Sequence, residues 1–187
     1  LSLLTSLGCE ASLTDTLEFP IIELDLADTL FLCRGDTLPL NPDGNPAYVY
    51  NWSPGATLSD STAANPLAFP QQTTTYQVDV QNFGSIDTCS LTETVTVVVN
   101  DAPLFTAPDD ITLCDDTDTL LVASSPLALD YLWALDPAFD NVVGEDSILL
   151  ANPLNERPRI YYLQVTDANG CVAVDSVAVG NYQAGLL

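Results

Sequence analysis

Residues 31–38, FLCRGDTL, and residues 50–52, YNW, form the stretch that decides the fold. A second copy of this stretch occupies residues 112–120, TLCDDTDTL, and residues 131–133, YLW. The tryptophan follows the cysteine at the same spacing in both copies. The chain therefore contains an internal repeat, and the repeat must be established first because it sets the domain organisation.

The cysteines define the period of this repeat. Each copy ends at a second cysteine, and the spacing from the first cysteine to the second is almost the same in the two copies. Equivalent cysteines recur at a nearly constant interval, and these pairs are Cys9 and Cys89, Cys33 and Cys114, and Cys89 and Cys171. A unit of this size suits a compact β-domain and is too long for a helical solenoid repeat.

This period divides the chain into the end of a preceding repeat, two full repeats and a short linker or tail. The predicted segments are residues 1–19, 20–100, 101–180 and 181–187. The first assignment rests on the sequence GCEASL around Cys9, which matches the sequence GCVAV around Cys171. We therefore expect Cys9 to be unpaired in this chain, and the chain to be part of a longer array in which neighbouring repeats are its partners.

The charge of the chain is strongly negative. It has 26 acidic residues, three Arg, no Lys and no His, which gives a formal net charge of −23. Such a surface repels nucleic acid and anionic lipid, so neither is expected as a partner. Hydrophobic residues make up 47% of the chain, which excludes a disordered acidic tail. No apolar run is long enough for membrane insertion.

The pattern of residues favours short strands. Apolar and polar residues alternate over residues 24–32 and 73–80, as in half-buried strands. The sequences NPDGNP at residues 41–46 and SPG at residues 53–55 are typical of turns. We predict an all-β sandwich in each full repeat, with Trp52 and Trp133 in the two cores.

Five cysteines at repeat spacing in a Lys-free acidic chain favour an oxidising compartment. The pairs predicted from order within each repeat are Cys33–Cys89 and Cys114–Cys171. Closing such a loop contributes roughly 4 kcal/mol in the chain-entropy model. Buried free thiols are the alternative, and metal ligation is disfavoured because the chain has no His and no CxxC motif.

The motifs resemble those of a known group of proteins. The pattern C-x-G-D-x-x-x-L at residues 33–40, Y-x-W-S-P at residues 50–54, L-S-D-x-x-x-x-N-P at residues 58–66 and T-T-T-Y-x-V-x-V at residues 73–80 is similar to immunoglobulin-like or PKD-like repeats of Bacteroidota surface proteins. Such repeats occur in gliding-motility-associated adhesins and other large cargo of type IX secretion. The second copy departs from the pattern after Cys114 and after Trp133, where the Gly-Asp and Ser-Pro steps are lost.

This resemblance implies tandem immunoglobulin-like β-sandwich domains on a bacterial cell surface. The implied function is structural, as a segment of a stalk, adhesin or filament that is secreted and extracellular. A homo-oligomer or filament is a further implied assembly. The alternative from another functional class is a ligand- or carbohydrate-binding accessory module, for which Tyr48, Phe139, Tyr162 and Tyr182 are the candidate exposed aromatics.

A second resemblance concerns O-glycosylation. Bacteroidota modify secreted proteins at Asp-Ser or Asp-Thr followed by an aliphatic residue, Ala, Met or Thr, and seven such tripeptides are present. The candidate acceptors are Thr16, Thr29, Thr37, Ser61, Thr119, Ser147 and Ser176. The alternative is that Asp-Thr-Leu is a favourable turn at the start of a strand in an acidic protein.

Catalysis is not expected, because a chain without His or Lys lacks the usual nucleophile systems.

No cofactor is required, and calcium is the one candidate, since hard cations bind carboxylate and carbonyl oxygens. The candidate ligands around the predicted linker are Asp101, Asp109, Asp110, Asp115, Asp116 and Asp118. The alternative is a solvated acidic face. The integrin-type tripeptide at residues 34–36 is expected to be structural, because the resemblance places it at the entry to a strand, where Cys33 would hold it rigid.

Overall fold

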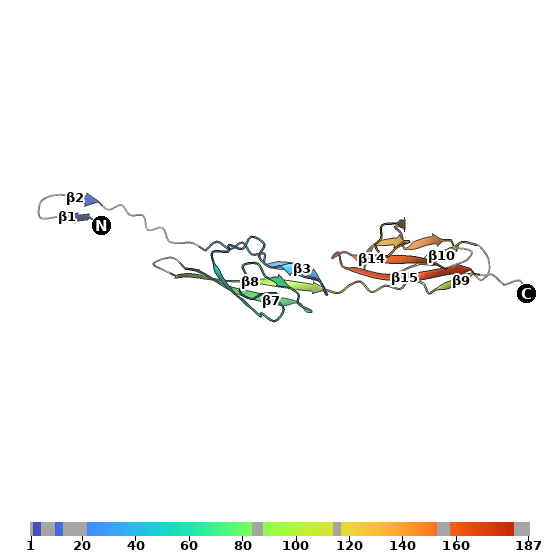
Figure 1. Cartoon of the computed structure of the whole chain (residues 1–187), viewed down its shortest axis with the longest axis horizontal. Helices are drawn as coiled ribbons and strands as arrows, with labels where there is room; N and C mark the ends of the chain where they lie inside the picture. Colours follow the sequence, from blue (N-terminus) through green and yellow to red (C-terminus); the bar gives the residue numbers. More distant parts are fainter. Residues whose placement is uncertain are drawn as a thin grey trace, which may run out of the picture. The chain divides into compact units, whose positions relative to one another are not determined.

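The computed structural model describes residues 2–4, 10–12, 22–83, 88–113, 117–152 and 158–181. These residues form strands β1 to β15 joined by turns and extended segments, and none of them is helical (Figure 1). The predicted all-β class is confirmed. No helix in the described ranges is long and apolar enough to cross a bilayer.

The first full repeat contains a four-stranded sheet in the order β3-β8-β7-β5. These strands are β3 (Thr29–Cys33), β8 (Thr88–Asn100), β7 (Thr74–Phe83) and β5 (Val49–Ser53). The strands β4 (Leu38–Pro39) and β6 (Leu67–Ala68) form a second, two-stranded sheet. Strand β5 pairs antiparallel with β7, whereas β3 pairs parallel with the end of β8.

The second repeat contains a five-stranded sheet in the order β12-β11-β14-β15-β9. These strands are β12 (Val142–Gly144), β11 (Ala128–Ala134), β14 (Arg159–Asp167), β15 (Val172–Asn181) and β9 (Ile111–Leu113). The strands β10 (Thr119–Val122) and β13 (Ile148–Ala151) form the accompanying two-stranded sheet. As in the first repeat, the first strand is parallel to the last, here β9 to β15. Both repeats are immunoglobulin-like β-sandwiches.

Two short strands precede these sandwiches. Strand β1 (Ser2–Leu4) pairs antiparallel with β2 (Glu10–Ser12). Residues 5–9, which include Cys9, lie outside the described residues.

Contacts between Cα atoms divide the chain into two compact units. The first unit comprises Leu1–Ala27, Pro39–Ala68 and Tyr76–Val95, and the second comprises Asp28–Leu38, Phe69–Thr75 and Thr96–Leu187. The second unit thus holds the whole second sandwich together with β3 and the last residues of β8. The predicted domain boundaries after residues 19, 100 and 180 stay predictions.

Both tryptophans are buried, as predicted. Trp52 on β5 is 2% exposed and Trp133 on β11 is fully buried. Each indole N–H donates to a backbone carbonyl further along the chain, Trp52 to Ala63 at 3.0 Å and Trp133 to Asp146 at 2.9 Å. The repeated spacing from cysteine to tryptophan therefore marks the same core position in each sandwich. In both, the buried indole N–H has a hydrogen-bond acceptor.

The core of the second sandwich forms around Trp133. Alternate residues of β14 point inward, so that Tyr161, Leu163 and Val165 are all buried in one cluster with Trp133. Leu121 of β10 and Leu149 of β13 belong to the same cluster and come from the opposing sheet. This period-two burial is what the alternating sequence predicts.

We expect Trp133→Ala to destabilise the protein by about 3–5 kcal/mol, because it leaves a large cavity in a closed core. The matched control is Leu129→Ala on the same strand, where the side chain is 65% exposed, and its cost is expected to stay within about 0.5 kcal/mol. Denaturant unfolding monitored by circular dichroism measures both. Equal effects of the two substitutions would contradict the core assignment.

Candidate functional site

The parallel pairing of β3 with β8 decides where Cys33 lies. Cys33 is the last residue of β3 and is in register with Asn100, the last residue of β8. The next residue continues the pairing, since the Arg34 amide donates to the Asn100 carbonyl at 2.8 Å. Cys33 is therefore at the end of the sheet from which the chain continues into residues 101–110.

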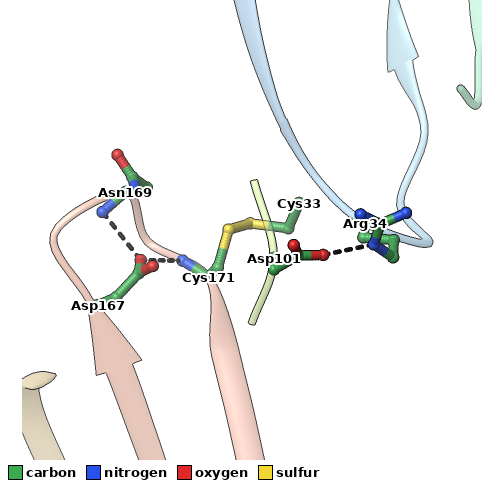
Figure 2. The surroundings of a disulfide bond; sticks show 6 residues. All are labelled: Cys33, Arg34, Asp101, Asp167, Asn169 and Cys171. Carbon is green, nitrogen blue, oxygen red and sulfur yellow. Dashed lines mark hydrogen bonds and ion pairs between the residues drawn. A yellow bond between two sulfur atoms is a disulfide. The ribbon is translucent and has the colours of Figure 1, made fainter. Parts of the chain in front are cut away.

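Cys33 forms a disulfide with Cys171, which lies 138 residues further along the chain (Figure 2). The S–S distance is 2.04 Å and the Cα–Cα distance is 5.5 Å. Cys171 is fully buried and directly precedes β15, so the bond connects the end of β3 in one repeat to the start of the last strand in the next.

A tight turn holds Cys171 in position. The buried Asp167 accepts hydrogen bonds through Oδ1 from the amides of Asn169 and Cys171, each at 2.9 Å (Figure 2). The Gly170 amide donates to the Asp167 carbonyl at 3.0 Å, and Gly170 has a φ of +80°, which favours glycine. The sequence DANGC thus forms a fixed loop that presents the cysteine.

The predicted pairing Cys33–Cys89 is wrong, because Cys33 is bonded to Cys171. Strand direction gives the reason. Cys89 is the second residue of β8, whereas Cys33 is level with Asn100 at its other end. Eleven residues of strand span roughly 36 Å at about 3.3 Å per residue, while bonded cysteines have Cα atoms about 5–6 Å apart.

The predicted pairing Cys114–Cys171 is also wrong, because Cys171 is bonded to Cys33. Cys114 lies outside the described residues, but Leu113 immediately before it is in register with Asn181, the last residue of β15. Cys171 directly precedes the first residue of β15. Asn181 at the other end of the strand is therefore roughly 33 Å from Cys171, at about 3.3 Å per residue. The side chain of Cys89 also lies outside what the structure describes.

An ion pair lies beside the disulfide. The Arg34 guanidinium donates through Nε to Oδ1 of Asp101 at 2.5 Å (Figure 2). It also donates through Nη1 to the carbonyl of Gln71. The hydrogen bond to Asp101, followed by charge attraction, lowers the pKa of Asp101 and raises that of Arg34. Arg34 of the RGD tripeptide is thus used within the protein. The ion pair, which the sequence did not suggest, joins the residue directly after β3 to the residue directly after β8.

The aspartates predicted to bind calcium are engaged separately where the structure describes them. Asp101 contacts Arg34, Oδ1 of Asp110 accepts from the Ala178 amide at 2.8 Å, and Oδ1 of Asp118 accepts from the Asn152 side chain at 2.6 Å. Asp109 is exposed, and Asp115 and Asp116 lie outside the described residues. Among the residues the structure describes, no three Cys, Asp or Glu side chains form a group that could hold a metal ion. Calcium binding stays a prediction.

The candidate glycosylation acceptors are dispersed over the described chain. Thr29, Thr37 and Ser176 are exposed, while Ser61, Thr119 and Ser147 are half-buried. Thr16 lies outside the described residues. Their modification is untested and stays a prediction.

Two of the aromatic candidates come together in a shallow pocket of about 300 Å³ in the second unit. Phe139, in the loop between β11 and β12, and Tyr162 on β14 line it together with Asp175 and Ser176 of β15. Phe139 has a φ of 58°, which is unusual for a side chain of this size. Tyr48 instead packs near Tyr50 of the first repeat, with ring centroids 6.4 Å apart, and Tyr182 lies beyond the described residues.

The Asp136 carboxylate holds the loop that carries Phe139. It accepts hydrogen bonds from the amides of Ala138, Asp140 and Asn141 at 3.0, 3.2 and 2.8 Å. Desolvation raises the pKa of Asp136, but the backbone hydrogen bonds outweigh it and the net shift is downward. The carboxylate therefore fixes the backbone conformation at the rim of the pocket.

No protein-family model and no curated protein matches the sequence. Solved structures similar to this chain contain tandem immunoglobulin domains. A chimeric titin Z1Z2-Z1Z2 tandem carrying a GRGDS peptide is 14% identical with a TM-score of 0.38, over 85% of this chain and 97% of that one. The DIP-gamma IG1+IG2 structure is 11% identical with a TM-score of 0.36, over 87% of this chain and 96% of that one.

A third similar structure contains three N-terminal domains of the bacteriophage RB49 outer capsid protein Hoc. It is 14% identical with a TM-score of 0.38, over 72% of this chain and 48% of that one.

The ion pair beside the disulfide gives a pH-dependent prediction. Because the pKa of Asp101 is lowered, the ion pair contributes fully at pH above about 4 and is lost as the pH falls through the lowered pKa. In Arg34→Ala we expect the Asp101 pKa to rise toward its ordinary value, as measured by NMR titration of the side-chain carboxyl.

Asp60 is the control, because hydrogen bonds from Thr62 lower its pKa independently of Arg34. Its titration should be unchanged in the variant. If Asp101 titrates at the same pH with and without Arg34, the ion pair does not form in solution.

Proposed function

We propose that this chain is a load-bearing structural segment of a large extracellular protein built of tandem immunoglobulin-like repeats. The observation that carries the proposal is the Cys33–Cys171 disulfide, which covalently connects one repeat to the next in addition to the peptide chain. Such a bond limits how far the chain can lengthen when it is pulled, a property that suits a segment under tension.

The connectivity of the disulfide supports a mechanical role. Residues 34–170 lie within a covalent loop closed by the disulfide. A force applied at the two ends would pass from β3 through the bond between the sulfurs and into β15. The remaining strands of both sandwiches lie outside this covalent path, so their unfolding could not lengthen the chain.

The finer assignment to a bacterial surface stalk, adhesin or filament is supported by the resemblance of the repeat motifs at residues 33–40 and 73–80. An extracellular location is supported by the disulfide, since such bonds persist in oxidising compartments. The absence of His and Lys from the sequence supports a non-enzymatic role. Neighbouring repeats are the proposed partners, and assembly into oligomers or filaments belongs to the same proposal.

Single-molecule stretching from the two termini tests the mechanical role. The oxidised chain is expected to reach full extension without release of the enclosed residues. Reduction is expected to add about 138 residues of length, or roughly 470 Å at about 3.4 Å per residue, together with the unfolding events of both sandwiches.

The control is Cys33→Ser, which should behave like the reduced chain under both conditions. Cys9, Cys89 and Cys114 are replaced by Ser in all samples so that no other thiol contributes. Release of the full length from a chain whose Cys33–Cys171 bond is verified as intact by peptide mapping would overturn the proposal.

The pocket at Phe139 and Tyr162 favours a second candidate function, the binding of carbohydrate. Aromatic faces pack against the apolar face of a sugar ring, and Asp175 and Ser176 provide hydrogen-bonding groups beside them. This candidate requires only the second sandwich and is compatible with a structural role for the whole chain.

Titration of the chain with a panel of neutral soluble oligosaccharides tests this second candidate. If a sugar binds in the pocket, Phe139→Ala is expected to weaken it about tenfold or more. Tyr48→Ala in the first repeat is the control and should leave the affinity unchanged. Equal weakening by both variants, or no binding by the native chain, would remove this candidate.

A further inference from the structure

In the first repeat the two cysteines lie at opposite ends of the last strand, and the described residues next to the cysteines of the second repeat follow the same register. In the first repeat Cys33 is level with the end of β8, and Cys89 is the second residue of that strand. In the second repeat the residue before Cys114 is level with the end of β15, and Cys171 directly precedes the strand. The last described residue before the first cysteine of the second repeat is thus at the strand end that corresponds to Cys33.

This arrangement rules out a bond within a repeat and allows one between repeats. The first cysteine lies at the end of the sandwich where the chain continues into the next repeat. The second cysteine of that next repeat is the one it meets, as Cys33 meets Cys171 at a Cα–Cα distance of 5.5 Å. The bond thus follows a rule, in which the first cysteine of one repeat pairs with the second cysteine of the repeat that follows.

We propose that Cys89 forms the same bond with the first cysteine of the repeat that precedes it, and that Cys114 forms it with the second cysteine of the repeat that follows. The partner is another copy of this repeat, so the inference rests on the tandem array of the proposed function. Every cysteine of the array then has a partner, and each repeat is covalently connected to both of its neighbours.

The bonds of such an array interleave. Cys89 and Cys114 both lie inside the loop closed by Cys33 and Cys171, so successive loops overlap. Tension would pass from one bond along β8 and the residues after it to Cys114, and from there into the next bond. Only the short segment between Cys89 and Cys114 carries the load between two bonds.

The disulfide is repeated in this arrangement, but the ion pair is not. Asp115 follows Cys114 at the position where Arg34 follows Cys33. The Arg34–Asp101 contact is therefore particular to one junction, whereas the cysteines recur at each repeat.

A fusion of two copies of the chain tests the rule directly. Leu187 of the first copy is followed by Asp25 of the second, which keeps between β15 and the next β3 the same number of residues, ten, that separate β8 from β9. We expect Cys114 of the first copy to be bonded to Cys89 of the second, in addition to a Cys33–Cys171 bond in each copy. Non-reducing peptide mapping after cleavage at acidic residues identifies the bonds.

Two variants of the fusion separate this inference from the proposed function. Cys114→Ser in the first copy should leave Cys89 of the second copy as an alkylatable thiol, with both Cys33–Cys171 bonds intact. Cys33→Ser in the first copy should free its Cys171 and leave the Cys114–Cys89 bond unchanged.

The outcomes are distinguishable. Free thiols at Cys114 of the first copy and at Cys89 of the second copy, with both Cys33–Cys171 bonds present, would overturn the interleaved array. That result would leave the proposed function standing. A bond from Cys114 to a cysteine of its own copy would also overturn it. Absence of the Cys33–Cys171 bonds would overturn the proposed function itself.

Discussion

The parallel pairing of the first strand of each sandwich with its last strand is the constraint on which the rest of the structure depends. Strand β3 runs parallel to the end of β8, and β9 runs parallel to the end of β15. A cysteine that ends the first strand is thereby placed where the chain leaves the sandwich. The disulfide to the following repeat, the ion pair of Arg34 and the covalent loop all follow from that position.

Much of the fold could be predicted from the sequence because burial follows local pattern. Alternation over residues 73–80 predicts which side chains of β7 point inward, and Tyr76, Val78 and Val80 are all buried. The spacing from cysteine to tryptophan likewise locates Trp52 and Trp133 in the two cores. These properties depend on the period of one strand and need no knowledge of how distant strands pair.

The cysteine pairing could not be predicted in the same way, because a periodic array makes two schemes equally regular. Bonds within each repeat and bonds from each repeat to the next both recur with the period of the repeat. The direction of β3 relative to β8 decides between them, and that is a long-range property. The Arg34–Asp101 contact was missed for a similar reason, since its two residues are 67 positions apart and the RGD sequence carries no signal for it.

The two connections beside Cys33 respond differently to the charge of the chain. Arg34 and Asp101 are exposed, so salt screens their attraction and such pairs contribute little to stability. The disulfide does not depend on ionic strength. A net charge of −23 means that neighbouring repeats repel one another when salt is low. The covalent bond between Cys33 and Cys171 is unaffected by this repulsion.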